Sequence, residues 1–235
     1  MIISTCQGLG DNWRKFADTA GPDSPAHNID ERTAIAHYQV GPPYIATALD
    51  MHKIVRRWAE LAPKVYNEKP QMMAEMYAYC LAAADIGLPH EVVNSMMVSQ
   101  IDTYGEGWNL IDTLPNNEVC LAGITPNRMQ NHLPMVFHYC QSYSAGGVSF
   151  YKYMMDDDIF TCQKPLLVEP VDDAMSPEKG HPPNIGRGKD MLLLKRNVFA
   201  TCLITSAVNE ALRFFKLHHC NDETSNKGNE LKPSS

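Results

Sequence analysis

Apolar residues recur at helical spacing in three stretches of the chain, and they form short runs elsewhere. The first stretch follows Asp50, a good helix N-cap, and ends before Pro63, which has no N–H to continue a helix. The second begins near Pro70 and ends at Gly87, a residue type common at helix C-termini. The apolar positions that define these two faces are Ile54, Trp58 and Leu61, then Met72, Met76, Cys80 and Ala83. Both patterns predict amphipathic helices.

The third stretch is the most apolar. Asp190 can cap a helix over residues 191–218, whose first half is apolar on most faces and is therefore expected to be buried. Its most apolar part, NVFATCLITSAV, is about 12 residues long, short of the roughly 18 that span a bilayer. The opening MIISTCQGLGDNW lacks the cationic and apolar regions of a signal peptide. The expectation is a chain without a transmembrane segment or a leader of its own.

Short apolar runs between turn residues predict the strands. These runs occupy residues 95–98, 119–122 and 135–139. Residues 34–47, AIAHYQVGPPYIAT, are typical of two strands separated at Pro42 and Pro43. Helices and strands in this mixed order predict one α/β domain over residues 34–219.

Polar segments flank and interrupt this domain. Residues 1–33 are dotted with Gly, Asp and Asn, and are expected to form a loosely held arm with one short helix around Trp13 to Phe16. Residues 165–190, rich in Pro, Gly and charge, predict a long irregular connection. The composition of residues 220–235 is typical of a disordered tail.

Composition narrows the function classes. The chain has 235 residues, 44% of them hydrophobic, which suffices for a sizeable core. Its formal net charge of −7 argues against nucleic acid as the main partner, because phosphate binding needs a basic surface. An acidic protein can still bind a nucleotide sugar through a metal ion and a few local cations.

Seven cysteines are spread along the chain, and no pair has the C-x-x-C spacing of a zinc or redox site. An odd number with wide gaps fits long-range disulfides in an oxidising compartment, and it fits buried free thiols equally well. The spacing leaves both alternatives open.

Three candidate chemical features stand out, and the first is the acidic run Asp156, Asp157 and Asp158. An Asp-any-Asp triplet after a buried strand can hold a divalent cation on a sugar-nucleotide diphosphate. Here the lead-in SFYKYMM follows the Gly146-Gly147 break and is not a buried strand pattern. A solvated acidic turn is the commoner reading of such a run.

The second feature is His138, which ends an apolar run in FHYCQSY. A neutral imidazole at that position could ligate a divalent metal or bond a phosphate, or it could bond a backbone carbonyl as an ordinary strand histidine. The third feature is Glu75, just off the apolar stripe of its helix. A carboxylate there could be catalytic or could position an acceptor, although a helix surface residue is the commoner case.

The order of motifs resembles one family of enzymes. The motifs are GPPYIATALDMHKIVRRWAELA, AEMYAYCLAAADIGLPH, GEGWNLID, FHYCQSYSAGGVSFYKY and CQKPLLVEP. Together, over residues 36–209, they resemble the plant and algal peptidyl serine α-galactosyltransferases and the related hydroxyproline O-arabinosyltransferases. The joint order is more specific than any single motif.

The resemblance implies a GT-A-like glycosyltransferase with a mixed sheet flanked by helices. It implies transfer of galactose or arabinose from a UDP-sugar, with Mn²⁺, to serine or hydroxyproline of hydroxyproline-rich glycoproteins. It also implies work in the secretory pathway, in the Golgi or endoplasmic reticulum. By position, Glu75 falls beside the expected active site as a catalytic candidate, and His138 falls in the strand that approaches the metal and the diphosphate.

The chain departs from the family in one respect. The family's nucleotide-binding half and its Asp-any-Asp motif lie upstream of the matched segment, and residues 1–35 contain no βαβ pattern. The expectation is a partial GT-A-like domain, its N-terminal nucleotide-binding half largely missing, in a truncated or inactive form. Asp156, Asp157 and Asp158 follow the HYC strand, so they are expected to be solvent-exposed and not to bind the donor metal.

Two other classes stay open. A non-catalytic module for Ser/Hyp-rich peptides would keep the acceptor face without a donor site. A His/Cys metal protein would use His138, Cys140 and the HHC sequence near the C-terminus.

Overall fold

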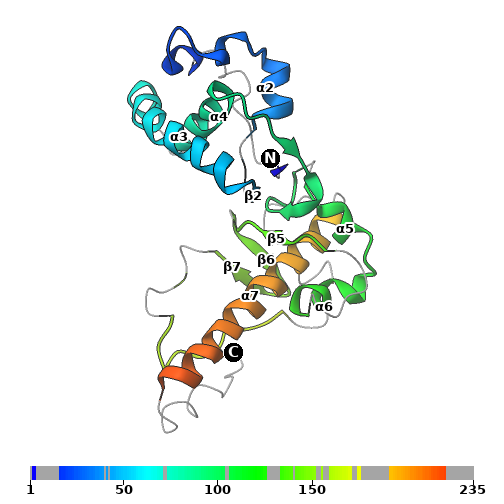
Figure 1. Ribbon diagram of the computed structural model, residues 1–235. Helices are drawn as coiled ribbons and strands as arrows, with labels where there is room; N and C mark the ends of the chain where they lie inside the picture. The colour runs from blue at the N-terminus through cyan, green and yellow to red at the C-terminus, as the bar shows by residue number, and fades with distance from the viewer. Residues whose placement is uncertain are drawn as a thin grey trace. The chain divides into compact units, whose positions relative to one another are not determined.

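The computed structural model of the chain describes the backbone of residues 2–3 and residues 16–39, 41, 43–70, 73–103, 106–125, 133–139, 141–151, 155, 159–170, 174–175 and 191–220. Two compact units form (Figure 1). Unit 1 comprises Met1–Val98, Tyr104–Gly107 and Pro134–His138. Unit 2 comprises Ser99–Thr103, Trp108–Leu133 and Tyr139–Ser235.

Unit 1 combines helices with short strands. Its helices are η2 (Asp18–Ala20), η3 (Pro25–Asn28), α2 (Glu31–His37), α3 (Ala48–Glu68), α4 (Ala74–Asp85) and η4 (Asn94–Met96). Its strands are β1 (Ile2–Ile3), β2 (Tyr44–Ile45), β3 (Glu91–Val92), β4 (Met97–Val98) and β5 (Val136–Phe137). One sheet has the order β2-β1-β3, antiparallel and then parallel, and β4 pairs with β5 in parallel.

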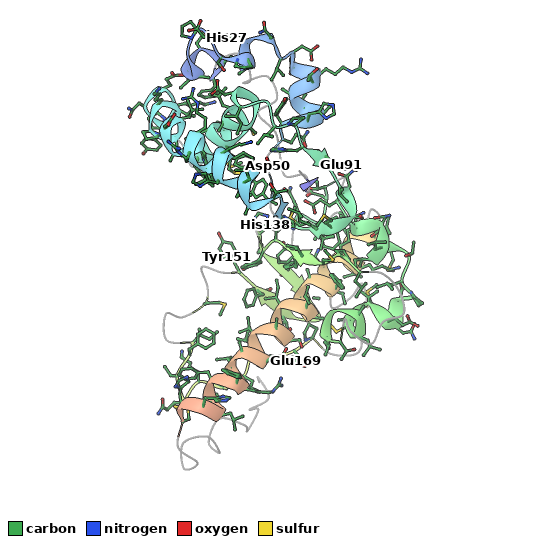
Figure 2. The ribbon with its side chains drawn as sticks, in the orientation of Figure 1. His27, Asp50, Glu91, His138, Tyr151 and Glu169 are labelled. Atoms are coloured by element: carbon green, nitrogen blue, oxygen red, sulfur yellow. A yellow bond between two sulfur atoms is a disulfide. The ribbon has the colours of Figure 1, made fainter. Side chains whose placement is uncertain are left out.

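Helix α3 starts earlier and ends later than its pattern predicts. Thr47, not Asp50, is the N-cap, because the Asp50 N–H donates to Thr47 Oγ1 over 3.1 Å (Asp50 is labelled in Figure 2). The helix continues through Pro63 to Glu68. Val65 is fully buried and extends the apolar stripe beyond the proline. Burial of that stripe therefore outweighs the one backbone hydrogen bond that proline removes.

The predicted arm is only partly correct. Residues 16–33 form helical turns, and Phe16, Ala20 and Ala26 belong to the hydrophobic core that α3 and α4 build. Arg57 of α3 anchors this segment, since its guanidinium donates to the Ala20 carbonyl over 2.8 Å. The predicted helix at Trp13 lies outside the described residues, apart from Phe16.

The strand predicted over residues 34–40 is wrong. Glu31–His37 is helix α2, and the Asp30 carboxylate caps it by accepting from the Thr33 N–H over 2.7 Å. A local cap and the following turn of helix override the short apolar alternation of AIAHY. The second predicted strand survives in part as β2.

Unit 2 is built around one long helix. Its elements are α5 (Trp108–Asp112), η5 (Asn116–Glu118), α6 (Val119–Ile124), the hairpin β6 (Tyr143–Ala145) and β7 (Val148–Phe150), and α7 (Met191–His219). The helix predicted over residues 191–218 is confirmed as α7. The strand predicted over 119–122 is wrong, because that run forms α6. The predicted strands at 95–98 and 135–139 are shorter than expected and appear as β4 and β5.

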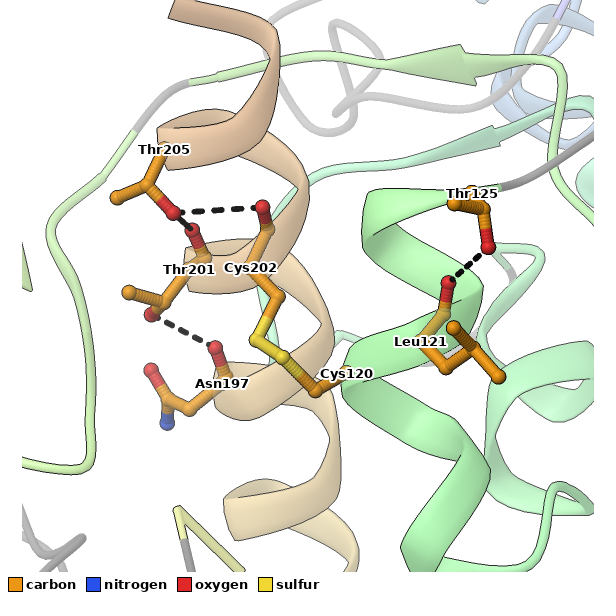
Figure 3. Close-up of a disulfide and its surroundings, with 7 residues drawn as sticks. All are labelled: Cys120, Leu121, Thr125, Asn197, Thr201, Cys202 and Thr205. Carbon is orange, nitrogen blue, oxygen red and sulfur yellow. Dashed lines mark hydrogen bonds between the residues drawn. A yellow bond between two sulfur atoms is a disulfide. The ribbon is translucent and has the colours of Figure 1, made fainter. Parts of the chain in front are cut away.

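Helices α6 and α7 are covalently joined. Cys120 and Cys202 form a disulfide between them (Figure 3). Gly123 permits close approach, since an added Cβ would lie 2.9 Å from both the Leu203 nitrogen and the Phe199 carbonyl oxygen of α7. Thr201 of α7 donates its hydroxyl back to the Asn197 carbonyl, which satisfies a polar group in this apolar contact.

Helix α7 is long and apolar enough, by length and composition, to cross a bilayer. However, 56% of its most apolar 18-residue window is buried inside the protein. A core helix of a folded domain has the same profile, and α7 contacts α5, α6 and the β6–β7 hairpin.

The chain is therefore of mixed α/β class, as predicted. The described residues form three small sheets of three, two and two strands instead of the one mixed sheet that was expected. Residues 165–170 carry no helix or strand, in line with the predicted irregular connection, and residues 221–235 lie outside the described residues.

Candidate functional site

His138 directly follows β5 in unit 1 (Figure 2). Its backbone N–H donates to the Val98 carbonyl over 2.9 Å, which extends the β4–β5 pairing by one residue. Met97 and Val98 of β4 are buried, so this pairing is anchored in the core. The His138 side chain is half-buried. Two buried neighbours thus fix the backbone from which its imidazole projects.

Part of the GEGW motif lies against the same strand pair. The Gly107 N–H donates to the Met97 carbonyl over 2.8 Å. A Cβ on Gly107 would lie 2.9 Å from the Ser95 carbonyl oxygen and 3.1 Å from Cγ of Pro134, so only glycine fits here without movement. The preceding residue, Glu106, is only 7% exposed although it is a carboxylate. A buried carboxylate needs a compensating partner, and Glu106 has an interaction of this kind.

Glu106 was missed by sequence reasoning. It lies between two glycines in a quoted motif, and an acid flanked by glycines before a buried tryptophan was the available signal. The structure therefore adds Glu106 to His138 as a candidate, because both adjoin the β4–β5 pair.

Glu75 occupies the first turn of α4, also in unit 1. Its side chain is exposed, and its backbone carbonyl accepts the indole N–H of Trp58 over 2.7 Å. A carboxylate in the first turn also suits the helix dipole, so its position has a sufficient structural reason. No described contact joins Glu75 to His138. The prediction that the two side chains face one cleft stays a prediction.

The prediction for Asp156, Asp157 and Asp158 also stays open, because these residues lie outside the described part of the chain.

Within the described ranges, no three His, Cys, Asp or Glu side chains gather where they could share a metal ion. Divalent Mn²⁺ takes several oxygen or nitrogen ligands. The described residues therefore offer Mn²⁺ only an incomplete ligand set, to which His138 would add one imidazole.

The alternative metal site of His138, Cys140 and the HHC sequence cannot use Cys220, and Cys140 lies outside the described residues. Cys220 forms a disulfide with Cys162, so its sulfur is not available as a thiolate ligand. His218 stacks on Phe214, with ring centroids 4.0 Å apart. Aromatic packing and a covalent bond thus explain the HHC residues.

The two disulfides resolve the cysteine alternatives in part. Cys120–Cys202 and Cys162–Cys220 are bonded, while Cys80 is a buried free thiol whose pKa is raised by burial. Disulfides that persist are typical of oxidising compartments.

His90 is a buried polar residue in unit 1. Its side chain is 2% exposed, and within the described part of the chain neither ring nitrogen has a hydrogen-bond partner of good geometry. The rings of Tyr38 and Tyr79 lie 6.3 and 5.7 Å from it between centroids. Burial lowers the pKa of His90 from its usual 6.5 to about 4, so the imidazole is neutral at pH 7.

Comparison with protein-family models, with curated proteins and with solved structures finds no match for this chain.

Proposed function

We propose that this chain carries the acceptor side of a glycosyltransferase that moves galactose or arabinose from a UDP-sugar to serine or hydroxyproline. The observation that carries the proposal is the ordered motif series. Its segments occupy consecutive features of the fold: β2 with α3, then α4, α5 and β5. The disulfides support work in the secretory pathway, where such acceptors are modified.

In this proposal His138 and Glu106 line the reacting region of unit 1. His138 would contact the metal–diphosphate group, and Mn²⁺ would offset negative charge on the departing diphosphate. Glu75 would position the acceptor hydroxyl. Glu106, as a buried carboxylate beside the β4–β5 pair, would orient neighbouring polar groups.

A non-catalytic module for Ser/Hyp-rich peptides is the second candidate. The observation that favours it is the incomplete metal ligand set among the described residues.

One experiment separates the two. Purified protein is titrated with UDP, with and without Mn²⁺, and with a Ser-Hyp-rich peptide, and the peptide is also incubated with Mn²⁺ and UDP-galactose or UDP-arabinofuranose to look for added sugar by mass. Because the chain is expected to be a truncated or inactive form, the transferase reading expects Mn²⁺-dependent UDP binding that His138→Ala weakens, with no added sugar. Peptide binding without UDP binding supports the binding module, and absence of binding to both overturns the proposal. His52→Ala, an exposed histidine on α3, is the matched control.

A further inference from the structure

The two disulfides of unit 2 differ in their surroundings. Cys120–Cys202 lies inside the contact between α6 and α7, and Cys202 is fully buried. Cys162–Cys220 lies just beyond the C-terminal end of α7, and both of its cysteines are half-buried. A disulfide is opened by a thiolate that reaches one of its sulfur atoms. Access therefore favours attack on Cys162–Cys220.

The leaving sulfur separates the two bonds further. Attack on Cys120, which is half-buried, expels Cys202 as a thiolate into the core of unit 2. Burial disfavours a thiolate, so this exchange is slow. Cys162 has a cation beside it instead, because Lys216 Nζ donates to its carbonyl oxygen over 2.8 Å. A neighbouring ammonium group stabilises a thiolate, so Cys162 is the better leaving group.

This exposed disulfide fastens a strap, residues 159–168, to α7. The strap contains no helix or strand, so side chains of α7 hold its backbone. Lys216 binds the carbonyl of Cys162. Asn209 binds both backbone groups of Leu167, accepting from its N–H over 2.7 Å and donating to its carbonyl over 3.0 Å. Without the disulfide, only such hydrogen bonds and the packing of side chains fix the strap.

The strap covers apolar surface. Phe160 of the strap packs edge-on against Phe215 of α7, with ring centroids 5.9 Å apart. Residues 164–168 form one wall of a hollow of about 380 Å³, and most of its lining is apolar. Release of the strap therefore exposes Phe215 and opens the hollow.

We propose that Cys162–Cys220 is a redox-sensitive latch. A dithiol reductant opens this bond before Cys120–Cys202, and the strap over residues 159–168 is then released from α7. The latch is independent of sugar transfer, and its tests use no sugar.

The exchange moves two electrons from the dithiol to the disulfide in two steps. A thiolate of the dithiol attacks Sγ of Cys220, the bond to Cys162 breaks, and Cys162 leaves as a thiolate beside Lys216. The second sulfur of the dithiol then attacks the first within the mixed disulfide and releases Cys220. The dithiol ends as a cyclic disulfide, and its two protons pass to solvent or to the freed cysteines.

The latch is reversible. Hydrogen bonds from Lys216 and Asn209 have a modest net strength in water, so the reduced strap opens and closes. In the closed form Cys162 lies beside Cys220 again, and an oxidant re-forms the bond.

The first test is timed reduction of the full chain by dithiothreitol. Samples are stopped with acid, unfolded, labelled with N-ethylmaleimide and read by mass spectrometry. Labels should appear on Cys162 and Cys220 at least about tenfold faster than on Cys120 and Cys202. Equal rates, or earlier opening of Cys120–Cys202, would overturn the proposal.

Lys216 gives a readout that looser packing cannot imitate. Lys216→Met removes the ammonium group and should slow the reduction of Cys162–Cys220 by about threefold or more. A lysine that only holds the strap would have the opposite effect, because its loss makes the sulfurs more accessible. Lys216→Arg should keep the parent rate, and so should Arg213→Met, which removes an exposed cation from the same helix. Faster reduction of Lys216→Met would contradict the proposed chemistry.

Hydrogen exchange shows whether opening the bond releases the strap. After reduction of Cys162–Cys220 alone, amides over residues 160–168 should exchange at least about tenfold faster, and those of α7 should change little. Reoxidation should restore the slow rates. Cys162→Ala with Cys220→Ala should match the reduced chain without any reductant, whereas Cys120→Ala with Cys202→Ala should respond to dithiothreitol as the parent does. An unchanged strap, or equal acceleration throughout unit 2, would show that this disulfide is no latch.

Discussion

At the scale of single residues, His90 makes the stability of unit 1 dependent on pH. Burial lowers the pKa of the folded-state imidazole to about 4, whereas an unfolded chain titrates near 6.5. Between these values the unfolded chain binds a proton that the folded chain does not, so stability is complete above about pH 6.5 and is lost as pH falls toward 4. The loss should reach about 3 kcal/mol.

The substitution His90→Phe should remove this loss. Phenylalanine has no nitrogen to leave unpaired and suits the rings of Tyr38 and Tyr79. Urea unfolding of both proteins at pH 7 and pH 5 measures the difference. His52→Phe, at an exposed position on α3, should keep the original pH dependence. If His90→Phe and the parent chain show the same slope, the buried imidazole is not the cause.

Replacing Gly107 or Gly123 by alanine should destabilise only the unit that contains the glycine. In Gly107→Ala the new Cβ would meet the Ser95 and Met97 carbonyl oxygens at 2.9 and 3.3 Å, so β4 must shift, at a cost of about 1–3 kcal/mol. In Gly123→Ala it would meet backbone atoms of α7 at 2.9 Å. Hydrogen exchange should speed up in unit 1 for the first variant and in unit 2 for the second. Faster exchange across both units in either variant would contradict this assignment.

At the scale of elements, the sequence pattern predicted a helix correctly where buried positions follow the helical period over many residues. The prediction of α7 is confirmed. Many of its apolar residues are buried in the core, and over so long a helix they leave a clear periodic pattern in the sequence. Short runs failed. Val119–Ile124 is helix α6 because Cys120 and Gly123 meet α7 there, a tertiary contact that four apolar residues cannot reveal.

Only part of the candidate site could be predicted from the sequence. His138 at the end of an apolar run was visible in the sequence, and the structure places it beside β4. Glu106 was not singled out, because the sequence does not show that its side chain is buried next to the Gly107–Met97 contact. Burial of a carboxylate is a property of the fold, and one sequence does not show it.

One ion pair joins α5 to α7. The Arg196 guanidinium donates to both carboxylate oxygens of Asp112, over 2.9 and 2.6 Å, and to the Ile101 carbonyl over 2.6 Å. Both side chains are largely buried, so Arg196→Met leaves the Asp112 charge unpaired and should cost about 3 kcal/mol. Chemical denaturation measures this loss.

The matched control for that prediction is Arg213→Met on the same helix. Arg213 is more than half exposed and lies 3.7 Å from Glu169, so its loss should cost less than about 1 kcal/mol. Adding Asp112→Leu to Arg196→Met should restore part of the stability, because the unpaired charge is then gone. Equal costs for the two arginines would contradict the proposed role of the pair.

At the scale of the whole molecule, the two units differ in what holds them together. Unit 1 has a core built by α3 and α4, and its described cysteine, Cys80, is a buried thiol. Both disulfides between described residues lie in unit 2, where they close sequence separations of 82 and 58 residues. Cross-links of that length restrict the unfolded chain, and each should contribute about 3–5 kcal/mol.

Reduction should therefore destabilise unit 2 selectively. Limited proteolysis with and without a phosphine reductant, read by mass spectrometry, should show new cleavage in residues 108–125 and 141–170 and little change in residues 43–98. The paired substitution Cys162→Ala with Cys220→Ala should free the segment over 164–168, because its upstream attachment to α7 is lost. Cys120→Ala with Cys202→Ala should instead loosen α6 and leave that segment protected by Asn209.

Cys80→Ala is the control, since a buried thiol takes no part in either cross-link. Cleavage that rises first in unit 1 under reduction would show that its stability, too, depends on a disulfide.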